Sequence, residues 1–267
     1  MLKSVFVIGM PASGKTTFVR HIQKMLPNKF VIHMDDYFFV NLMKKIENCF
    51  EEDIFFNKNT GSFVDGKLFL CLTDLIISEY KLLCDEVHID SYQALNLMID
   101  TLNKFNLGLI AKKIDLSILK KDESVKEALD SFIDSYDLNL NCLQKGAVLF
   151  AFEFSRGVRK DKIASQTDGL GYMNAFSIIP ETLLLQSKII YIKTDLDFRT
   201  ENNLRRKGIL SDKDFILNHH VSEKAMNINY FDDDFGDLDN KNLSVIENKN
   251  DVDWNVIGSS LVKELLL

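Results

Sequence analysis

The chain has 267 residues, of which 46% are hydrophobic and 27% charged, an ordinary balance for a globular protein. This length suits one large α/β domain, or one domain that carries a sizeable insert. A formal net charge of -7 and a pI near 5.3 argue against a broad surface for nucleic acid or for anionic membranes. No apolar run approaches the roughly 20 residues of a membrane helix, no signal peptide is visible, and the cysteines form no close pair. We therefore expect a cytoplasmic protein with reduced thiols.

The first segment of the chain predicts a strand, a loop and a helix. Residues 3–8 are a short apolar run typical of a buried strand, and residues 14–26 place their apolar side chains on one helical face. Between them, residues 9–16 read GMPASGKT, the pattern GxxxxGK[ST] of a P-loop. Backbone N–H groups in such a loop bind phosphate, while its lysine reaches the β- and γ-phosphates and its hydroxyl residue coordinates Mg²⁺. The sequence thus predicts a site for ATP and Mg²⁺ built by Gly9, Ser13, Gly14, Lys15, Thr16 and Thr17.

Four later apolar runs predict the rest of a parallel sheet. They cover residues 30–34, 147–152, 189–192 and 243–246. Near-continuous apolar strands separated by helices are typical of parallel strands that are covered on both faces. We expect a doubly wound sheet of five strands, with the nucleotide at the C-terminal edge of the first strand and a closing helix over 253–266.

Residues 41–145 have a different character, because their apolar residues recur at helical spacing and no buried strand is evident. The clearest helical face lies within 125–136, behind Asp122 as a plausible N-cap. We expect a helical insert that binds substrate or acts as a lid, between the two parts of a core at 1–40 and 146–267. The Phe-rich stretch 50–69 belongs either to the hydrophobic core or to the wall of a substrate cavity.

The stretch after the second strand carries a family resemblance. Residues 34–38, MDDYF, resemble the D-x-F-[YH] context of the P-loop small-molecule kinases, especially the branch of uridine kinase, pantothenate kinase and phosphoribulokinase. The resemblance covers roughly 1–40 and 146–267 and implies an ATP-dependent phosphotransferase with Asp35 as its catalytic base. Asp36 and Tyr37 would then lie near the acceptor. Such a base is required because the acceptor hydroxyl loses a proton as the phosphoryl group moves, although a helix cap is the other role open to this aspartate pair.

The same resemblance assigns roles to residues after the third strand. Glu153 ends that strand and resembles the Walker B acid, which would join Thr16 in the metal shell. Arg156 and Arg159 follow, either as ligands of a substrate phosphate or carboxylate or as ordinary surface arginines. Residues 154–157 and 169–174 depart from the uridine kinase pattern, so the resemblance does not name the acceptor.

Residues after the fourth and fifth strands complete the kinase pattern. The segment 193–207 resembles the lid of these kinases, with Arg199, Arg205 and Arg206 as contacts of the ATP phosphates. Arg205 and Arg206, together with Lys15, would stabilise the charge that develops during transfer. A basic helix face without a ligand is the alternative. Asn248 matches a position near the nucleotide base.

Other functions remain open from the sequence. Asn248-Lys249-Asn250-Asp251 spells NKxD, the guanine-recognition sequence of GTPases, which would make the chain a GTP-binding switch. Against this, the motif comes very late in the chain, and the D-x-x-G at 168–171 follows no apolar strand. A kinase that acts on a macromolecule or an activated sugar is a further possibility. We expect ATP and a small-molecule acceptor, such as a nucleoside, sugar or cofactor precursor, as partners, with no nucleic acid, no membrane and an open oligomeric state.

Overall fold

The chain folds into an α/β structure around a five-stranded sheet in which every strand pairing is parallel. The computed structural model describes residues 3–26, 30–114, 120–146, 148–157, 170–207, 221–230, 232–237, 242–249, 252–254, 256–257 and 259. The strands, in the order β2-β3-β1-β4-β5, are β1 (Lys3–Ile8), β2 (Phe30–Asp35), β3 (Val148–Phe154), β4 (Ser187–Lys193) and β5 (Leu243–Glu247). The five predicted strands are thus confirmed, each within a few residues.

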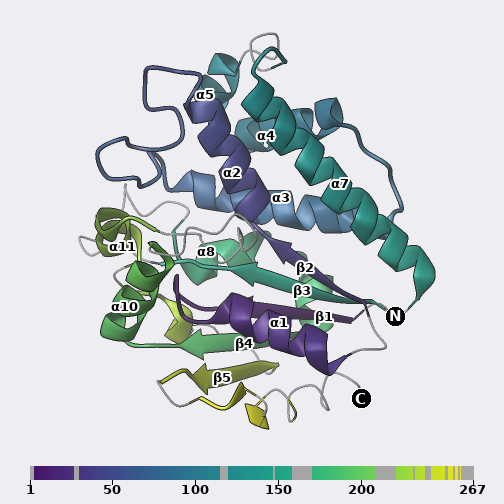
Figure 1. Ribbon diagram of the computed structural model, residues 1–267, viewed down its shortest axis with the longest axis vertical. Helices are drawn as coiled ribbons and strands as arrows, with labels where there is room; N and C mark the ends of the chain where they lie inside the picture. Colours follow the sequence, from purple (N-terminus) through teal and green to yellow (C-terminus); the bar gives the residue numbers. More distant parts are fainter. Residues whose placement is uncertain are drawn as a thin grey trace.

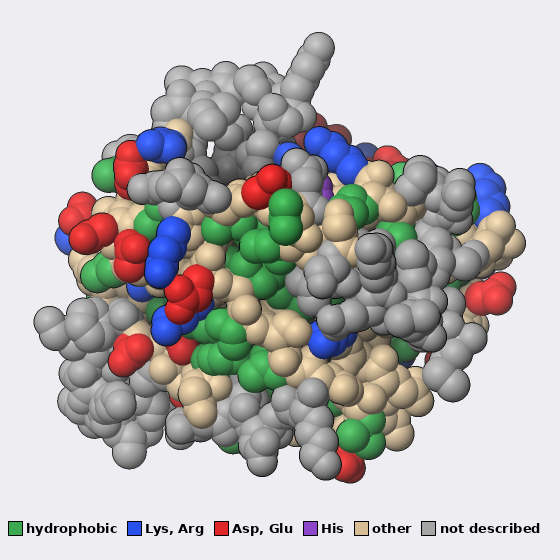
Figure 2. Space-filling model, turned by 90° about the horizontal axis from the view of Figure 1, so that it is seen from below, with side chains coloured by type: hydrophobic (Ala, Val, Ile, Leu, Met, Phe, Trp, Pro, Cys, Tyr) green, Lys and Arg blue, Asp and Glu red, His purple; other side chains and the backbone are tan. Residues whose placement is uncertain are grey.

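The helices of the described ranges lie between these strands along the chain. They are α1 (Lys15–Met25), α2 (Tyr37–Glu47), α3 (Lys67–Cys84), α4 (Ser91–Lys104), α5 (Gly108–Lys113), α7 (Glu123–Lys145), α8 (Gly171–Ile178), α9 (Glu181–Leu185), α10 (Leu196–Lys207), α11 (Glu223–Asn229) and the short 3-10 helix η3 (Phe235–Asp237). None of the described helices combines the length and the apolar character that a membrane crossing requires. On the face drawn in Figure 2, acidic and basic side chains lie next to one another around a central group of hydrophobic side chains.

The central strand β1 is apolar throughout because both faces of the sheet are covered. Phe6 and Ile8 belong to the larger core, which also contains residues of α3, α4, α7 and α8. Val5 and Val7 point to the opposite face and belong to a second core with α1. Since side chains alternate along a strand, a strand between two helical layers must be apolar at every position.

The helices α1 and α8 lie on opposite faces of the sheet. The strands β1 and β3 are hydrogen-bonded neighbours; α1, which follows β1, packs on one face, and α8, the first described helix after β3, packs on the other. Neighbouring strands with diverging connections open a crevice at their carboxyl ends, where α/β proteins bind ligands. In Figure 1 all strand arrows point the same way, with their heads toward α10 and α11. A ligand site is therefore expected at this edge of the sheet.

The helices between β2 and β3 share the larger core with the sheet. Leu72 of α3 and Met98 of α4 are buried in the same cluster as Phe6 and Phe152 of the strands. The first of these helices, α2, already begins at Tyr37, so the boundary predicted after residue 40 falls within a helix. Asp122 is the predicted N-cap of α7, and its side chain accepts the backbone N–H groups that follow it. The division into core and insert stays a prediction, and the predicted helix 253–266 lies mostly outside the described residues.

Candidate active site

The loop between β1 and α1 turns tightly at the carboxyl edge of the sheet. Gly14 has a φ of 99°, and a Cβ atom at this position would lie 2.8 Å from the side-chain nitrogen of Asn248. A Cβ atom at Gly9 would lie 2.6 Å from the backbone oxygen of Ile192 in β4. Asn248, just after β5, donates from Nδ2 to the Ser13 carbonyl at 2.7 Å. Glycine is required at these two positions, because the end of β4 and the residue after β5 lie against the loop.

The N-terminus of α1 has the features of an anion site. Its N-cap residue is Gly14, so no side chain caps the helix. The first backbone N–H groups of a helix have no partner within it, and the helix dipole adds positive potential there. Lys15 is buried and its Nζ donates to the Met10 carbonyl at 3.0 Å. The buried Ser13 hydroxyl has no hydrogen-bond partner among the described residues, whereas Thr17 is exposed. Positive potential and open donors therefore meet in this loop.

Two carboxylates stand beside this loop at the ends of β2 and β3. Asp35 and Glu153 are direct partners in the register of the two strands. Glu153 accepts a hydrogen bond from the Thr16 hydroxyl at 2.8 Å through Oε1 and bonds to His33 Nε2 at 2.8 Å through Oε2. Asp35 accepts the Tyr37 N–H at 2.9 Å and lies 3.6 Å from His33 Nε2. The imidazole ring thus bridges the two acids.

The charges of this group depend on one another. Burial by itself lowers the pKa of His33, but Asp35 and Glu153 together raise it to about 9. Burial raises the pKa of Asp35 to about 6, against the opposing effect of His33. Burial also disfavours the Glu153 carboxylate, yet the hydrogen bond and charge of His33 hold its pKa below the usual range. At neutral pH a protonated His33 therefore lies between two ionised acids.

Sequence reasoning had assigned no role to His33. It lies on β2 two residues before Asp35, and side chains at that spacing share one face of a strand. It is also the only polar residue in the apolar run 30–34. A polar residue in an apolar strand, two positions before a candidate base and on the same face, is a signal that could have identified His33.

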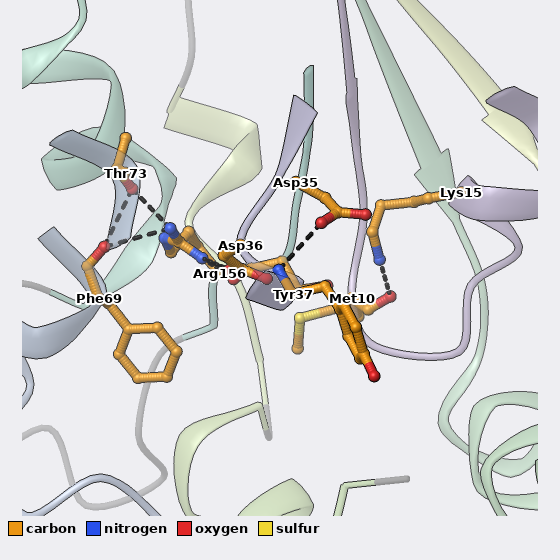
Figure 3. A network of polar contacts seen from close by, with 9 residues as sticks. Met10, Lys15, Asp35, Asp36, Tyr37, Phe69, Thr73 and Arg156 are labelled. Carbon is orange, nitrogen blue, oxygen red and sulfur yellow. Dashed lines mark hydrogen bonds and ion pairs between the residues drawn. The ribbon is translucent and has the colours of Figure 1, made fainter. Parts of the chain in front are cut away.

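Arg156 connects the start of α2 to α3 (Figure 3). Its side chain is 1% exposed, and Nη1 lies 3.3 Å from Asp36 Oδ2. Nη2 donates to the Phe69 carbonyl at 3.1 Å and to the Thr73 hydroxyl at 2.5 Å. Burial raises the pKa of Asp36, and the charge of Arg156 opposes this rise. In this structure the guanidinium group holds protein groups together, and the prediction that Arg156 contacts substrate stays a prediction.

One cavity of about 520 Å³ adjoins the loop, the strand ends and α2. Lys15, Thr16, Asp35, Asp36, Tyr37, Gly14 and Glu153 all line it. Its far wall is aromatic. Phe56 stacks on Phe63 with ring centroids 4.8 Å apart, Phe63 meets the edge of Phe69 at 4.8 Å, and Phe69 meets Tyr230 at 5.8 Å. Part of the Phe-rich stretch therefore lines the cavity, while Phe55 of the same stretch is fully buried in the core.

The described arginines of the predicted lid do not line this cavity. Arg199 is buried and donates to the Tyr230 carbonyl at 3.3 Å. Arg205 is exposed and pairs with Glu201 at 2.6 Å. Arg159, Asn250, Asp251 and the side chain of Arg206 lie outside the described residues. The contacts of the lid arginines with ATP, of Arg159 with substrate, and of Asn250 and Asp251 with guanine stay predictions.

The oxygen atoms of Thr16 and Glu153 form a pair suited to a hard cation. Mg²⁺ prefers oxygen ligands, keeps several waters and uses few protein groups when it binds with a phosphate substrate. Among the described residues, no cluster of three or more His, Cys, Asp or Glu side chains could hold a metal ion by protein ligands alone. A hydroxyl beside a carboxylate at 2.8 Å fits a cation that shares its shell with a bound phosphate.

Comparisons with known proteins do not extend this description. The sequence matches no family model, and no curated protein matches it. What the site can do is therefore inferred from its own groups: Lys15 and Thr16 in the loop, Asp35 and Glu153 at the strand ends, and one cavity that all four line.

Proposed function

We propose that this chain is a P-loop kinase that transfers the γ-phosphoryl group of ATP to a hydroxyl of a small molecule. One observation carries the proposal. An uncapped helix N-terminus with Lys15 and Thr16 opens on the same cavity as two strand-end carboxylates, Asp35 and Glu153. The first pair suits a polyphosphate, and the second supplies an acid for a metal shell and a base for an acceptor.

The loop would bind the β- and γ-phosphates. The backbone N–H groups at the start of α1 donate to phosphate oxygens, and Lys15 exchanges the Met10 carbonyl for a phosphate oxygen. Thr16 and Glu153 would hold Mg²⁺, which neutralises phosphate charge when bound. These groups fix the γ-phosphorus at the edge of the sheet, facing Asp35.

Asp35 would orient the acceptor hydroxyl and take its proton. With a pKa of about 6 it is ionised at neutral pH, yet more basic than an ordinary aspartate. As the acceptor oxygen bonds to the γ-phosphorus, the bond from that phosphorus to the β,γ-bridging oxygen breaks and ADP leaves. The proton of the hydroxyl passes to the Asp35 carboxylate. Tyr37 N–H keeps one carboxylate oxygen in place during this step.

Calorimetry with ATP and Mg²⁺ tests the nucleotide half of the proposal. Lys15→Ala should weaken ATP binding at least tenfold, the effect of losing about one charge-assisted hydrogen bond. Lys24→Ala, on the exposed side of the same helix, is the matched control and should bind as the unaltered protein does. Equal ATP affinity in the Lys15 variant would remove the basis of the assignment.

An ATP-consumption screen tests the transfer half. Nucleosides, nucleotides, sugars and vitamin precursors are supplied in turn with ATP and Mg²⁺, and phosphorylated product is measured. We expect one acceptor class to give product, with little ATP hydrolysis in its absence. Exclusive binding of GTP, with hydrolysis that needs no acceptor, would instead favour the GTP-switch interpretation.

A further inference from the structure

Aromatic side chains and lysines line the part of the cavity beyond Asp35. In Figure 3, Lys15 and Asp35 lie on one side of Asp36, and Phe69 lies on the other. The aromatic wall is therefore at the end away from the loop. If the γ-phosphoryl group leaves the loop toward Asp35, as the proposed function requires, the acceptor occupies this end. The inference below rests on the proposed function for that orientation.

The carboxylates that line the cavity already have partners. Asp36 faces Arg156 at 3.3 Å, and Glu153 bonds to His33. Glu47 is buried and accepts the backbone N–H groups of residues 54, 55 and 56 at 3.0, 2.6 and 3.3 Å. The protein thus supplies an ion pair to Asp36 and Glu153 and hydrogen bonds to Glu47, which keeps its negative charge because its partners are backbone N–H groups.

Among the described residues, the lysines at this end form no ion pair with an acid. Lys44 lies on the last turn of α2 and lines the cavity, and no ion pair is recorded for it within the described residues. It keeps contact with water, yet the surrounding protein lowers the pKa of its ammonium group. Lys58 also lines the cavity, and its Nζ donates to the carbonyls of Phe50 and Glu51. Two lysines and one carboxylate without a cationic partner, Glu47, therefore line this end of the cavity, which leaves a net positive charge within the described residues.

We propose that the acceptor carries an anionic group, a phosphate or a carboxylate, on a flat ring, and that Lys44 contacts the anion. Phe56, Phe63, Phe69 and Tyr230 present faces and edges on which a planar ring packs well. The exposed Lys44 ammonium group lines the cavity and can give an anion bound there a charge-assisted hydrogen bond. A neutral sugar would leave the ammonium group without a charged partner.

Binding of matched compound pairs, measured by calorimetry, tests this assignment. Uridine against uridine monophosphate and pyridoxine against pyridoxine phosphate probe a phosphate, and para-hydroxybenzyl alcohol against para-hydroxybenzoate probes a carboxylate. Each pair is measured with and without a saturating non-hydrolysable ATP analogue, which keeps the nucleotide probes out of the ATP site. The anionic member of at least one pair should bind roughly tenfold or more tightly, the effect of one charge-assisted hydrogen bond.

The variants assign the preference to one residue. Lys44→Met keeps the aliphatic stem and should abolish the preference, while Lys44→Arg should retain it. Lys45→Met, on the same turn of α2 but outside the cavity lining, is the control and should leave the preference intact. Thermal unfolding of each variant checks that the fold is retained.

Three results would overturn the inference: equal binding of neutral and anionic members in every pair, tighter binding of the neutral members, or a preference that survives Lys44→Met. If ATP fails to bind but the anion preference and its dependence on Lys44 hold, the kinase proposal falls and the anion site stands. The failure of one is therefore distinguishable from the failure of the other.

Discussion

The β1–α1 loop and the segment between α2 and α3 line the same cavity, but different interactions hold them in place. The loop owes its shape to two glycines and to one side-chain contact with Asn248. The α2–α3 segment is held by buried charge, with Glu47 accepting three backbone N–H groups and Arg156 linking Asp36 to α3. At the first end, backbone conformation and one amide contact set the shape. At the second, buried charged groups hold the segment in place.

This difference predicts opposite consequences for substitution. Asp35→Asn, at the strand end beside the loop, should lower turnover far more than it lowers the free energy of unfolding. Changes to Glu47 or Arg156 should lower the free energy of unfolding, because each leaves buried polar partners without a counterpart. The variants below test the contrast, beginning with the largest expected effect.

Asp35→Asn should lower turnover by roughly 10²- to 10⁴-fold, the usual range for loss of a general base. The change keeps the size of the side chain, so ATP binding should survive, and turnover of the unaltered protein should rise as pH passes about 6. Steady-state kinetics on the acceptor found in the screen measures both. Asp36→Asn is the comparison and should be milder on turnover. A more damaging Asp36→Asn would move the base by one residue.

Arg156→Met should lower the free energy of unfolding by about 3 kcal/mol, because it leaves Asp36 and two acceptors on α3 without their partner. Urea unfolding measures the loss. Arg205→Met removes an exposed arginine in an ion pair and should cost less than about 1 kcal/mol. Combining Arg156→Met with Asp36→Asn should cost less than the sum of the two single changes, since the pair is coupled. Strict additivity would contradict the link drawn in Figure 3.

Glu47→Gln should lower the free energy of unfolding by about 2 kcal/mol, because an uncharged amide replaces a carboxylate that accepts several backbone N–H groups. The same urea titration applies, with the exposed Glu51→Gln as the matched control. A loss no greater than that of the control would show that Glu47 does not hold the segment, and the contrast between the two ends would weaken.

The remaining expected effect is a pH dependence of stability at His33. Its pKa rises from 6.5 to about 9 on folding, so the folded protein binds the extra proton. The stabilisation is fully present below pH 6.5 and is lost as pH rises through about 9. His33→Gln should flatten this decline in the free energy of unfolding, whereas Glu79, whose pKa burial raises to about 8, titrates in either protein. His88→Gln at an exposed site is the control, and a decline unchanged in His33→Gln would exclude the bridge between the acids.

Periodicity was enough to predict the elements but not their limits. Near-continuous apolar runs and helical patterns located five strands, α1 and the Asp122 cap of α7, because these depend on residues close in the chain. The boundary placed after residue 40 rested on a change of pattern, and α2 runs through it from Tyr37. The Phe-rich stretch was left between core and cavity, and it divides between them: Phe55 is core while Phe56 faces the cavity.

By itself, the sequence determined the class of the fold and placed Lys15, Thr16, Asp35 and Glu153 at one edge of a parallel sheet. It could do so because parallel strands bring their carboxyl ends to the same edge, whatever the intervening helices do. Only the tertiary structure decided which charges are paired. Arg156 meets Asp36 across 120 residues of sequence, and His33 joins acids from two strands. Pairing and burial depend on groups distant in the chain, so no local pattern could show that the acids of the cavity are satisfied while Lys44 is not.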